Sequence, residues 1–160
     1  MEDIWNITAL VVSVLSVLLS LYALRQATTK NTSDMYLFFI SQYAKEDMKL
    51  ALRKLKDIKR GVYRLEQWES DMKNNLPKAF EYDEARRLVK YFYDTLAYMK
   101  LEKLIVARFV RLICLKKGAW LYLDTVEAME KFFDSGYDKK PYAVIRDVCE
   151  NLRKEGCCPP

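Results

Sequence analysis

The side chains of this sequence that could do chemistry are acids and cysteines, because the 160-residue chain contains no histidine. Histidine is the commonest general base and the commonest metal ligand, so its absence removes many enzyme mechanisms. Glu81, Asp83 and Glu84 come nearest to a carboxylate site. Acids at a helix start are explained as well by the helix dipole, and we expect Asp83 to cap a helix there. No glycine-rich phosphate loop, serine nucleophile elbow or dinucleotide fingerprint occurs, so we predict no catalytic residues, no cofactor and no enzymatic activity.

Four cysteines offer thiol chemistry. Cys157 and Cys158 are adjacent near the C-terminus, where they could bind a soft metal or carry a lipid. No Cys-x-x-Cys pair and no histidine complete a tetrahedral zinc site, so we predict no metal and an exposed tail. Cys114 and Cys149 fall on apolar helical faces, and we expect them to be small buried hydrophobic residues.

Basic side chains could bind an anionic partner. One set recurs at steps of three and four, which places it on one face of a helix. This basic stripe comprises Lys45, Lys49, Arg53, Lys56 and Arg60. It could contact anionic lipid or an acidic protein, or it could be an ordinary solvated face. A helix standing upright on a membrane would carry the stripe beyond the Debye length of about 8 Å, so lipid contact requires a helix folded back along the membrane.

Lys90 is followed by three aromatic residues at positions 91–93, and basic residues cluster in residues 100–111. Such mixtures can bind single-stranded nucleic acid. The net charge of +5 is modest and the basic residues are spread over several predicted helices. We therefore do not expect nucleic-acid binding.

The element that must position all of these residues is an apolar run at residues 4–24, which contains no charge. About 20 apolar residues in a helix span the roughly 30 Å of a bilayer core. A cleaved signal peptide is the alternative, but such peptides begin with basic residues, whereas Glu2 and Asp3 are acidic. We predict a retained membrane anchor.

The flanks of this run predict its orientation. Arg25 and Lys30 follow it and no basic residue precedes it, so the positive-inside rule places the N-terminus outside and the rest of the chain in the cytoplasm. Trp5 and Tyr22 lie near its ends, where aromatic rings favour the headgroup layer.

Small residues recur along one face of the run at steps of four and three. This predicted transmembrane interface comprises Ala9, Ser13, Ser16, Ser20, Ala23 and Ala27. Small side chains let membrane helices approach closely, and a serine hydroxyl bonded across the contact is worth about 0.6 kcal/mol. The hydroxyls could instead bond within their own helix. The pattern favours self-association or docking on another membrane subunit, with the lipid bilayer as the second partner.

Beyond a polar link at residues 26–33, apolar residues from Leu37 to Leu65 step by three and four in one continuous stripe, which predicts a helix. Gly61 predicts an end or a kink of this helix near that residue. The link has no Gly or Pro, so the anchor helix can run straight into it. Shorter helical patterns follow, and Gly118 is expected to close one of them. They cover residues 63–77 (a short helix, then a loop), 83–99, 104–115, 119–134 and 142–155. The residues expected on the buried faces of three of these helices are Ala85, Leu88, Val89, Phe92, Leu96 and Met99; Trp120, Leu123, Val126, Met129 and Phe133; and Ile145, Val148, Cys149 and Leu152. No window alternates with period two, so the fold class is all-α.

The domain organisation follows from these elements. We predict a membrane anchor helix at residues 1–27, an α-helical cytoplasmic domain at residues 28–155 and a C-terminal tail at residues 156–160. The composition, 51% hydrophobic and 31% charged, is that of a globular chain. About 130 residues are enough for one domain with its own core.

Residues 84–133 carry a resemblance to a known family. The segment reads EARRLVKYFYDTLAYMKLEKLIVARFVRLICLKKGAWLYLDTVEAMEKFF, with the similarity centred on residues 86–99, the helix that follows and the region of Trp120. With the preceding span and basic helix, it resembles the prokaryotic membrane-anchored domain-of-unknown-function proteins of bacterial, archaeal and prophage genomes. The resemblance implies an anchored helical domain without an established active site. This chain departs from the family where Lys100 to Lys103 replace a glycine-containing turn.

These patterns predict a non-catalytic, single-pass membrane protein that acts as an accessory or scaffold subunit of a membrane complex. One alternative is a membrane-anchored signalling or anti-phage defence effector that oligomerises through its anchor. Another is an enzyme with an unrecognised site. The sequence does not identify the partner or the stoichiometry.

Overall fold

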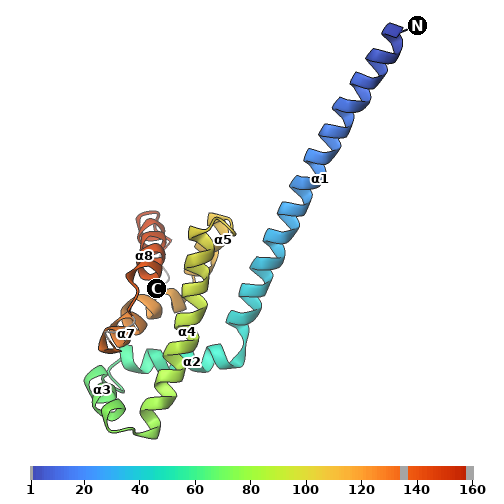
Figure 1. The fold of residues 1–160 in the computed structure, drawn as a ribbon. Coiled ribbons are helices and arrows are strands. Elements are labelled where there is room, and N and C mark those ends of the chain that lie inside the picture. Colours follow the sequence, from blue (N-terminus) through green and yellow to red (C-terminus); the bar gives the residue numbers. More distant parts are fainter. Residues whose placement is uncertain (1, 134–136, 158–160) are drawn as a thin grey trace. The chain divides into compact units, whose positions relative to one another are not determined.

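The computed structural model describes the backbone of residues 2–133 and 137–157, with side chains described from residue 16 onward except at 24, 25, 27–29 and 31. Over these residues the chain is helical throughout and has no strand, which confirms the all-α prediction. The elements are α1 (Glu2–Ala44), α2 (Glu46–Lys59), α3 (Leu65–Lys73), α4 (Pro77–Leu101), α5 (Ala107–Cys114), α6 (Lys117–Leu121), the π-helical segment η1 (Tyr122–Val126), α7 (Glu127–Phe133) and α8 (Lys139–Lys154) (Figure 1).

The chain divides into two units, residues 1–37 and residues 38–160. The first unit is helical, and α1 continues unbroken through the link at residues 26–33, as the absence of Gly and Pro there predicts. Within the described part of the chain, no helix combines the length and apolar character needed to cross a membrane. Most of the predicted anchor at residues 4–24 precedes residue 16, outside the described side chains. The anchor therefore stays a prediction.

The predicted single helix from Leu37 to Leu65 is wrong, because the chain breaks at Lys45. Lys45 has extended backbone angles (φ −60°, ψ 148°) and precedes α2, which ends at Lys59. The apolar stripe is therefore shared between the end of α1 and α2. An apolar pattern with helical spacing can continue across such a break when both helices bury their apolar residues in the same core. The pattern therefore does not show where the chain turns.

The core of the second unit forms around α4, which runs along the unit and contacts α2, α3, α5, η1 and α8 (Figure 1). Its predicted inner face is largely confirmed: Val89, Phe92 and Leu96 are buried, and Tyr91 is 75% exposed. Leu88, predicted to be buried, is 38% exposed.

The start of α4 differs from the prediction. The helix begins at Pro77, which suits a first helical position because its missing N–H has no partner there anyway. Asp83 is therefore not a cap: it lies inside α4 and is buried. The expected role of Glu81, Asp83 and Glu84 as first-turn acids is wrong for the same reason.

Gly118 does not end a helix as predicted. It lies buried within α6, and a Cβ added there would lie 2.7 Å from the hydroxyl oxygen of Tyr93 and 3.0 Å from that of Tyr43. The glycine is required by close packing, not by a left-handed turn. The preceding helix, α5, begins at Ala107 and leaves Leu104 exposed outside it.

The predicted helix at residues 119–134 is built from α6, η1 and α7 in succession. Among its predicted inner residues, Val126 and Met129 are fully buried. The last helix, α8, begins at Lys139, where the Asp138 carboxylate accepts a bond from the Lys140 amide (2.9 Å). Its predicted buried face is confirmed. The buried residues are Ile145, Val148, Cys149 and Leu152.

Four helices end in the same backbone motif, with a left-handed residue after the cap. In each, the next amide donates to the carbonyl five residues earlier. The left-handed residues are Gly61 (φ 74°), Asn75 (φ 55°), Lys103 (φ 56°) and Gly156 (φ 73°), and the bonds run from Val62 to Asp57 (3.0 Å), Leu76 to Asp71, Leu104 to Met99 and Cys157 to Leu152 (2.9 Å each). Glycine and asparagine adopt this conformation readily, so Lys103 is the exception.

Candidate functional site

The predicted transmembrane interface lies partly within the described side chains. Ser16, Ser20 and Ala23 are exposed on α1. The Ser20 hydroxyl donates to the Ser16 carbonyl at 2.8 Å, so it bonds within its own helix. The side chains of Ala9, Ser13 and Ala27 lie outside the described residues.

The basic stripe is placed on and around α2, and all five of its residues are exposed. Lys45 precedes the helix, and Lys49 pairs with Glu46 at 3.3 Å. Two other lysines of α2 face the bundle: Lys54 pairs with Glu81 of α4 (3.0 Å) and Lys59 pairs with Asp124 of η1 (2.5 Å). The stripe therefore lies on the outer side of α2, whereas Lys54 and Lys59 pair α2 with α4 and η1.

A groove of about 280 Å³ lies in the second unit between the end of α1, α2 and α4. Its lining is mostly apolar and aromatic, with a few polar side chains at the rim. The lining residues are Phe38, Phe39, Gln42, Lys45, Asp47, Met48, Leu88, Tyr91, Phe92 and Thr95. This groove is the candidate binding site that the sequence reasoning missed, because it depends on the corner at Lys45.

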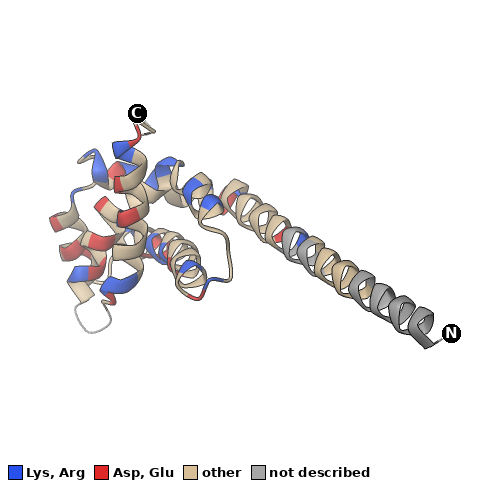
Figure 2. Ribbon diagram, turned by 90° about the horizontal axis from the view of Figure 1, so that it is seen from above, with Lys and Arg blue, Asp and Glu red and all other residues tan. Residues whose placement is uncertain are grey.

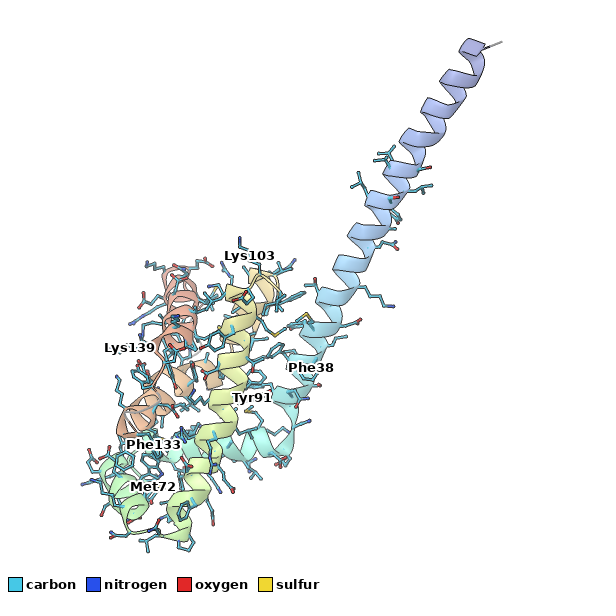
Figure 3. The ribbon with its side chains drawn as sticks, in the orientation of Figure 1. Phe38, Met72, Tyr91, Lys103, Phe133 and Lys139 are labelled. Carbon is cyan, nitrogen blue, oxygen red and sulfur yellow. The ribbon has the colours of Figure 1, made fainter. Side chains whose placement is uncertain are left out.

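The floor and rim of the groove differ in burial. Phe39 is 4% exposed and packs edge-on against Phe92, with ring centroids 5.4 Å apart. At the rim, Phe38 and Tyr91 are 56% and 75% exposed, and Figure 3 labels both. An apolar floor with exposed aromatic side chains at the rim suits a hydrophobic side chain or a small apolar ligand.

A buried charged cluster joins α4 to α7. Asp83, Arg86, Glu127 and Glu130 are between 5% and 8% exposed. Arg86 pairs with Asp83 (2.7 Å) in its own helix and with Glu130 across the contact, and its guanidinium lies 4.6 Å from the ring centre of Phe133. Buried charges are tolerated when they are paired in this way.

The cluster extends through η1 and α8. Lys90 lies 2.5 Å from Asp94 and 3.8 Å from Glu130, and the Tyr122 hydroxyl donates to Asp94 (2.5 Å). Burial, and then the bond to Asp94, raises the pKa of Tyr122 well above its usual value. Each carboxylate of the cluster has at least one basic partner, so the cluster is suited to fixing the helices relative to one another.

Glu127 holds the far side of the same cluster. It accepts bonds from Arg146 of α8 and from the Tyr137 hydroxyl. Burial, and then the bond to Glu127, raises the pKa of Tyr137 to about 12. The sequence contained a signal for part of this network, because Arg86 and Lys90 stand three and four residues from Asp83 and Asp94, at pairing distance on a helix.

The cysteines lie where their sequence positions suggest. Cys114 and Cys149 are buried, as predicted, and their mutual hydrogen bond together with burial raises the pKa of the Cys114 thiol. Cys157 is exposed, and Cys158 lies outside the described residues. Among the described side chains, no group of three or more His, Cys, Asp or Glu residues is arranged to hold a metal ion.

Comparison of the chain with protein-family models, with curated proteins and with solved structures finds no match. The resemblance to the membrane-anchored domain-of-unknown-function family accordingly stays a prediction.

Proposed function

We propose that this is a non-catalytic, single-pass membrane protein that serves as an accessory or scaffold subunit of a membrane protein complex. The observation that carries the proposal is the surface of α1 at residues 16–23. Val17, Leu18 and Leu19 expose 58, 57 and 68% of their surfaces, and Leu21 and Tyr22 expose 57 and 62%. Successive helical residues are rotated by about 100°, so these five side chains spread over about 200° of the helix circumference. Ser16, Ser20 and Ala23 lie in the remaining sector.

A helix that exposes large apolar side chains over more than half of its circumference needs a cover of lipid or of other helices. Burying one valine or leucine side chain stabilises by about 1.5–3 kcal/mol relative to leaving it in water. The uncharged run at residues 4–24 has the length of a bilayer core, which favours lipid as the cover. Figure 2 shows many Lys, Arg, Asp and Glu residues on the second unit, whereas residues 16–23 contain none. Arg25 and Lys30 favour a cytoplasmic location for the second unit.

Assembly would use two surfaces. Within the bilayer, the small residues from Ala9 to Ala27 permit close helix contact. On the second unit, the groove with Phe38 and Tyr91 at its rim accepts an apolar side chain of a partner subunit. A scaffold of this kind needs no catalytic group.

A second candidate function is a membrane-anchored signalling or defence effector. The same groove favours it, because a volume of about 280 Å³ is near the lower limit for a small-molecule site. In this case a bound ligand would alter oligomerisation through the anchor. The two candidates differ in what accompanies the protein in its membrane.

The anchor is tested by washing membranes that contain the full chain with alkaline carbonate. The wild-type chain should stay with the lipid. Leu18→Arg with Leu19→Arg should release it, because charge at the centre of a span costs about 2.5–3.5 kcal/mol per residue. Leu50→Arg, at a position 46% exposed on α2, is the matched control and should stay bound. Release of the wild-type chain would show that the run is not an anchor.

The accessory role is tested by gentle extraction from native membranes, followed by mass measurement of the particle. Other membrane subunits at a fixed ratio support the accessory role, and a homo-oligomer supports the effector. Replacing Ser13, Ser16 and Ser20 with Leu should abolish either assembly. Val14→Leu with Val17→Leu is the control, since it enlarges side chains off the predicted interface. Assembly that survives the serine changes would exclude this interface.

A further inference from the structure

The turn between α4 and α5 exposes a group of apolar side chains. Leu101, Leu104 and Val106 are 47, 60 and 52% exposed, whereas Ile105 between them is buried. Figure 3 labels Lys103 at the tip of this turn. Aliphatic side chains grouped in water are unfavourable, and such a group marks an interaction surface.

Backbone hydrogen bonds hold this turn in shape. The Leu104 amide donates to the Met99 carbonyl (2.9 Å), and the Lys103 amide donates to the Lys100 carbonyl (3.2 Å). In this motif the residue at the position of Leu104 ordinarily packs back on the last helical turn. Here Leu104 is the most exposed of the three apolar residues, so a fixed turn presents it outward.

Lys103 is the second unusual feature. The equivalent positions at the ends of the other three helices of this type are Gly61, Asn75 and Gly156, which adopt the left-handed conformation more easily. A lysine there is strained relative to glycine. Such strain is retained where the side chain has a use.

The charge around the turn is strongly positive. Residues 100–117 contain six Lys or Arg and one acid, Glu102. Lys100 lies 3.7 Å from Asp147, and Arg111 pairs with Glu155. In the part of the chain that the structure describes, Lys103 and Arg108 are exposed and have no ion-pair partner. Lys103 lies within the apolar group in sequence and Arg108 follows it, and both cations suit an anionic surface.

We propose that this turn is a membrane-contact surface that binds anionic lipid. Leu101, Leu104 and Val106 enter the acyl-chain boundary, and Lys103 and Arg108 contact the phosphate headgroups. Lipid fits better than an acidic protein, because protein interfaces are enriched in aromatic residues and depleted of lysine. The contact goes beyond the proposed anchor: it belongs to the second unit alone and does not require that residues 4–24 span a bilayer.

The test is amide hydrogen exchange of residues 99–108 in the full chain, measured by mass spectrometry with two kinds of vesicle. One is phosphatidylcholine, and the other is phosphatidylcholine mixed with phosphatidylglycerol. The inference expects slower exchange of this segment with the anionic vesicles. High salt should remove the difference, because it screens the headgroup charge.

Lys103→Gly is the decisive variant because it removes the charge while relieving the left-handed strain. Its thermal stability should be unchanged or higher. The protection of the segment by anionic vesicles should fall about fivefold, which corresponds to the binding free energy that one basic residue contributes at such a surface. Asn75→Gly relieves the same conformation in the α3–α4 turn and is the matched control. It should leave the protection unchanged.

The apolar contribution has its own pair of variants. Leu104→Ser should weaken protection, whereas Leu76→Ser, at a position 44% exposed in another turn, should not. Equal exchange in neutral and anionic vesicles, or a Lys103→Gly protein that matches Asn75→Gly, would overturn the inference. Protection by soluble polyglutamate without protection by vesicles would assign the turn to an acidic protein instead. Carbonate washing of the same vesicles reports on the anchor separately, so failure of the anchor and failure of the turn are distinguishable.

Discussion

The two sides of α4 are packed by opposite means. Toward α2, the buried part of the contact is apolar, with the Lys54–Glu81 ion pair at its surface. Leu55 of α2 is fully buried, and so are Val89 and Leu96 of α4. Toward α7, the contact is ionic, with Arg86 held between Asp83 and Glu130. Apolar contacts tolerate repacking, whereas a buried charge requires its partner. The α4–α7 contact should therefore fail more abruptly when one residue changes.

Arg86→Ala should have the largest effect. It leaves the buried Asp83 and Glu130 carboxylates without their central partner, which costs about 3–5 kcal/mol. Urea unfolding measures the loss. The control is Arg87→Ala, because Arg87 also pairs with Asp83 (3.0 Å) but is 61% exposed and should cost less than about 1 kcal/mol. Equal losses for the two variants would mean that the ionic contact is no more demanding than a surface pair.

Leu55→Ala should come next. It removes a fully buried side chain between α2 and α4, and such truncations cost about 2–5 kcal/mol, depending on how far the neighbours relax. The same urea experiment measures it. Leu50→Ala on the outer side of α2 should change stability by less than about 0.5 kcal/mol. If Leu55→Ala lowers the free energy of unfolding more than Arg86→Ala does, the apolar side of α4 is the more sensitive of the two to a single substitution.

Alkaline pH should weaken the ionic side at Tyr122. Burial and the bond to Asp94 raise the pKa of Tyr122 in the folded chain above its unfolded value near 10. Its contribution is therefore complete below pH 10 and is lost as the pH rises above it, by about 1.4 kcal/mol per pH unit.

Urea midpoints between pH 8 and pH 11, read with tyrosinate absorbance, test this dependence. Tyr122→Phe should reduce the slope above pH 10 by one proton, although the other buried tyrosines keep part of it. Tyr91→Phe, at the exposed rim of the groove, serves as the control. Identical slopes for wild type and Tyr122→Phe would remove Tyr122 from the pH response.

The smallest effect should come from the pair between Lys59 and Asp124, which joins α2 to η1 at the surface. Both side chains are 47% exposed, so Lys59→Ala should cost about 0.2–1 kcal/mol and less in high salt. A double-mutant cycle with Asp124→Ala isolates the pair. A coupling energy above this range would mean that this exposed pair, like the buried charged cluster, stabilises the fold more strongly than a surface ion pair ordinarily does.

The difference between the apolar and the ionic side of α4 explains which features could be predicted from the sequence. The apolar side follows a helical period, so the all-α class and the buried Val89, Leu96 and Ile145 were predicted correctly. The ionic side was missed, because charged residues at helical spacing are ordinarily solvated. Glu127 and Glu130 give no local sign that they will meet Arg146 and Arg86, respectively, across the fold.

The candidate site was less predictable than the fold. The groove depends on a corner at Lys45, where no Gly or Pro marks a break. Gly118 suggests a helix end because glycine is common there, but in the structure its missing side chain leaves room for the hydroxyls of Tyr43 and Tyr93. Local preferences do not report how closely distant helices approach each other.

The π-helical segment η1 influences how the residues that follow it are oriented. A π-turn accommodates one more residue than an α-turn, and such bulges are frequently inserted within α-helices. Deleting a single residue between Tyr122 and Val126 would therefore let the segment become an ordinary α-helix while Glu127 and Glu130 keep their orientation. Inserting a further residue there would instead rotate the residues after it by about 100° and turn Glu130 away from Arg86. The charged cluster thus tolerates the loss of one residue at this point better than the gain of one.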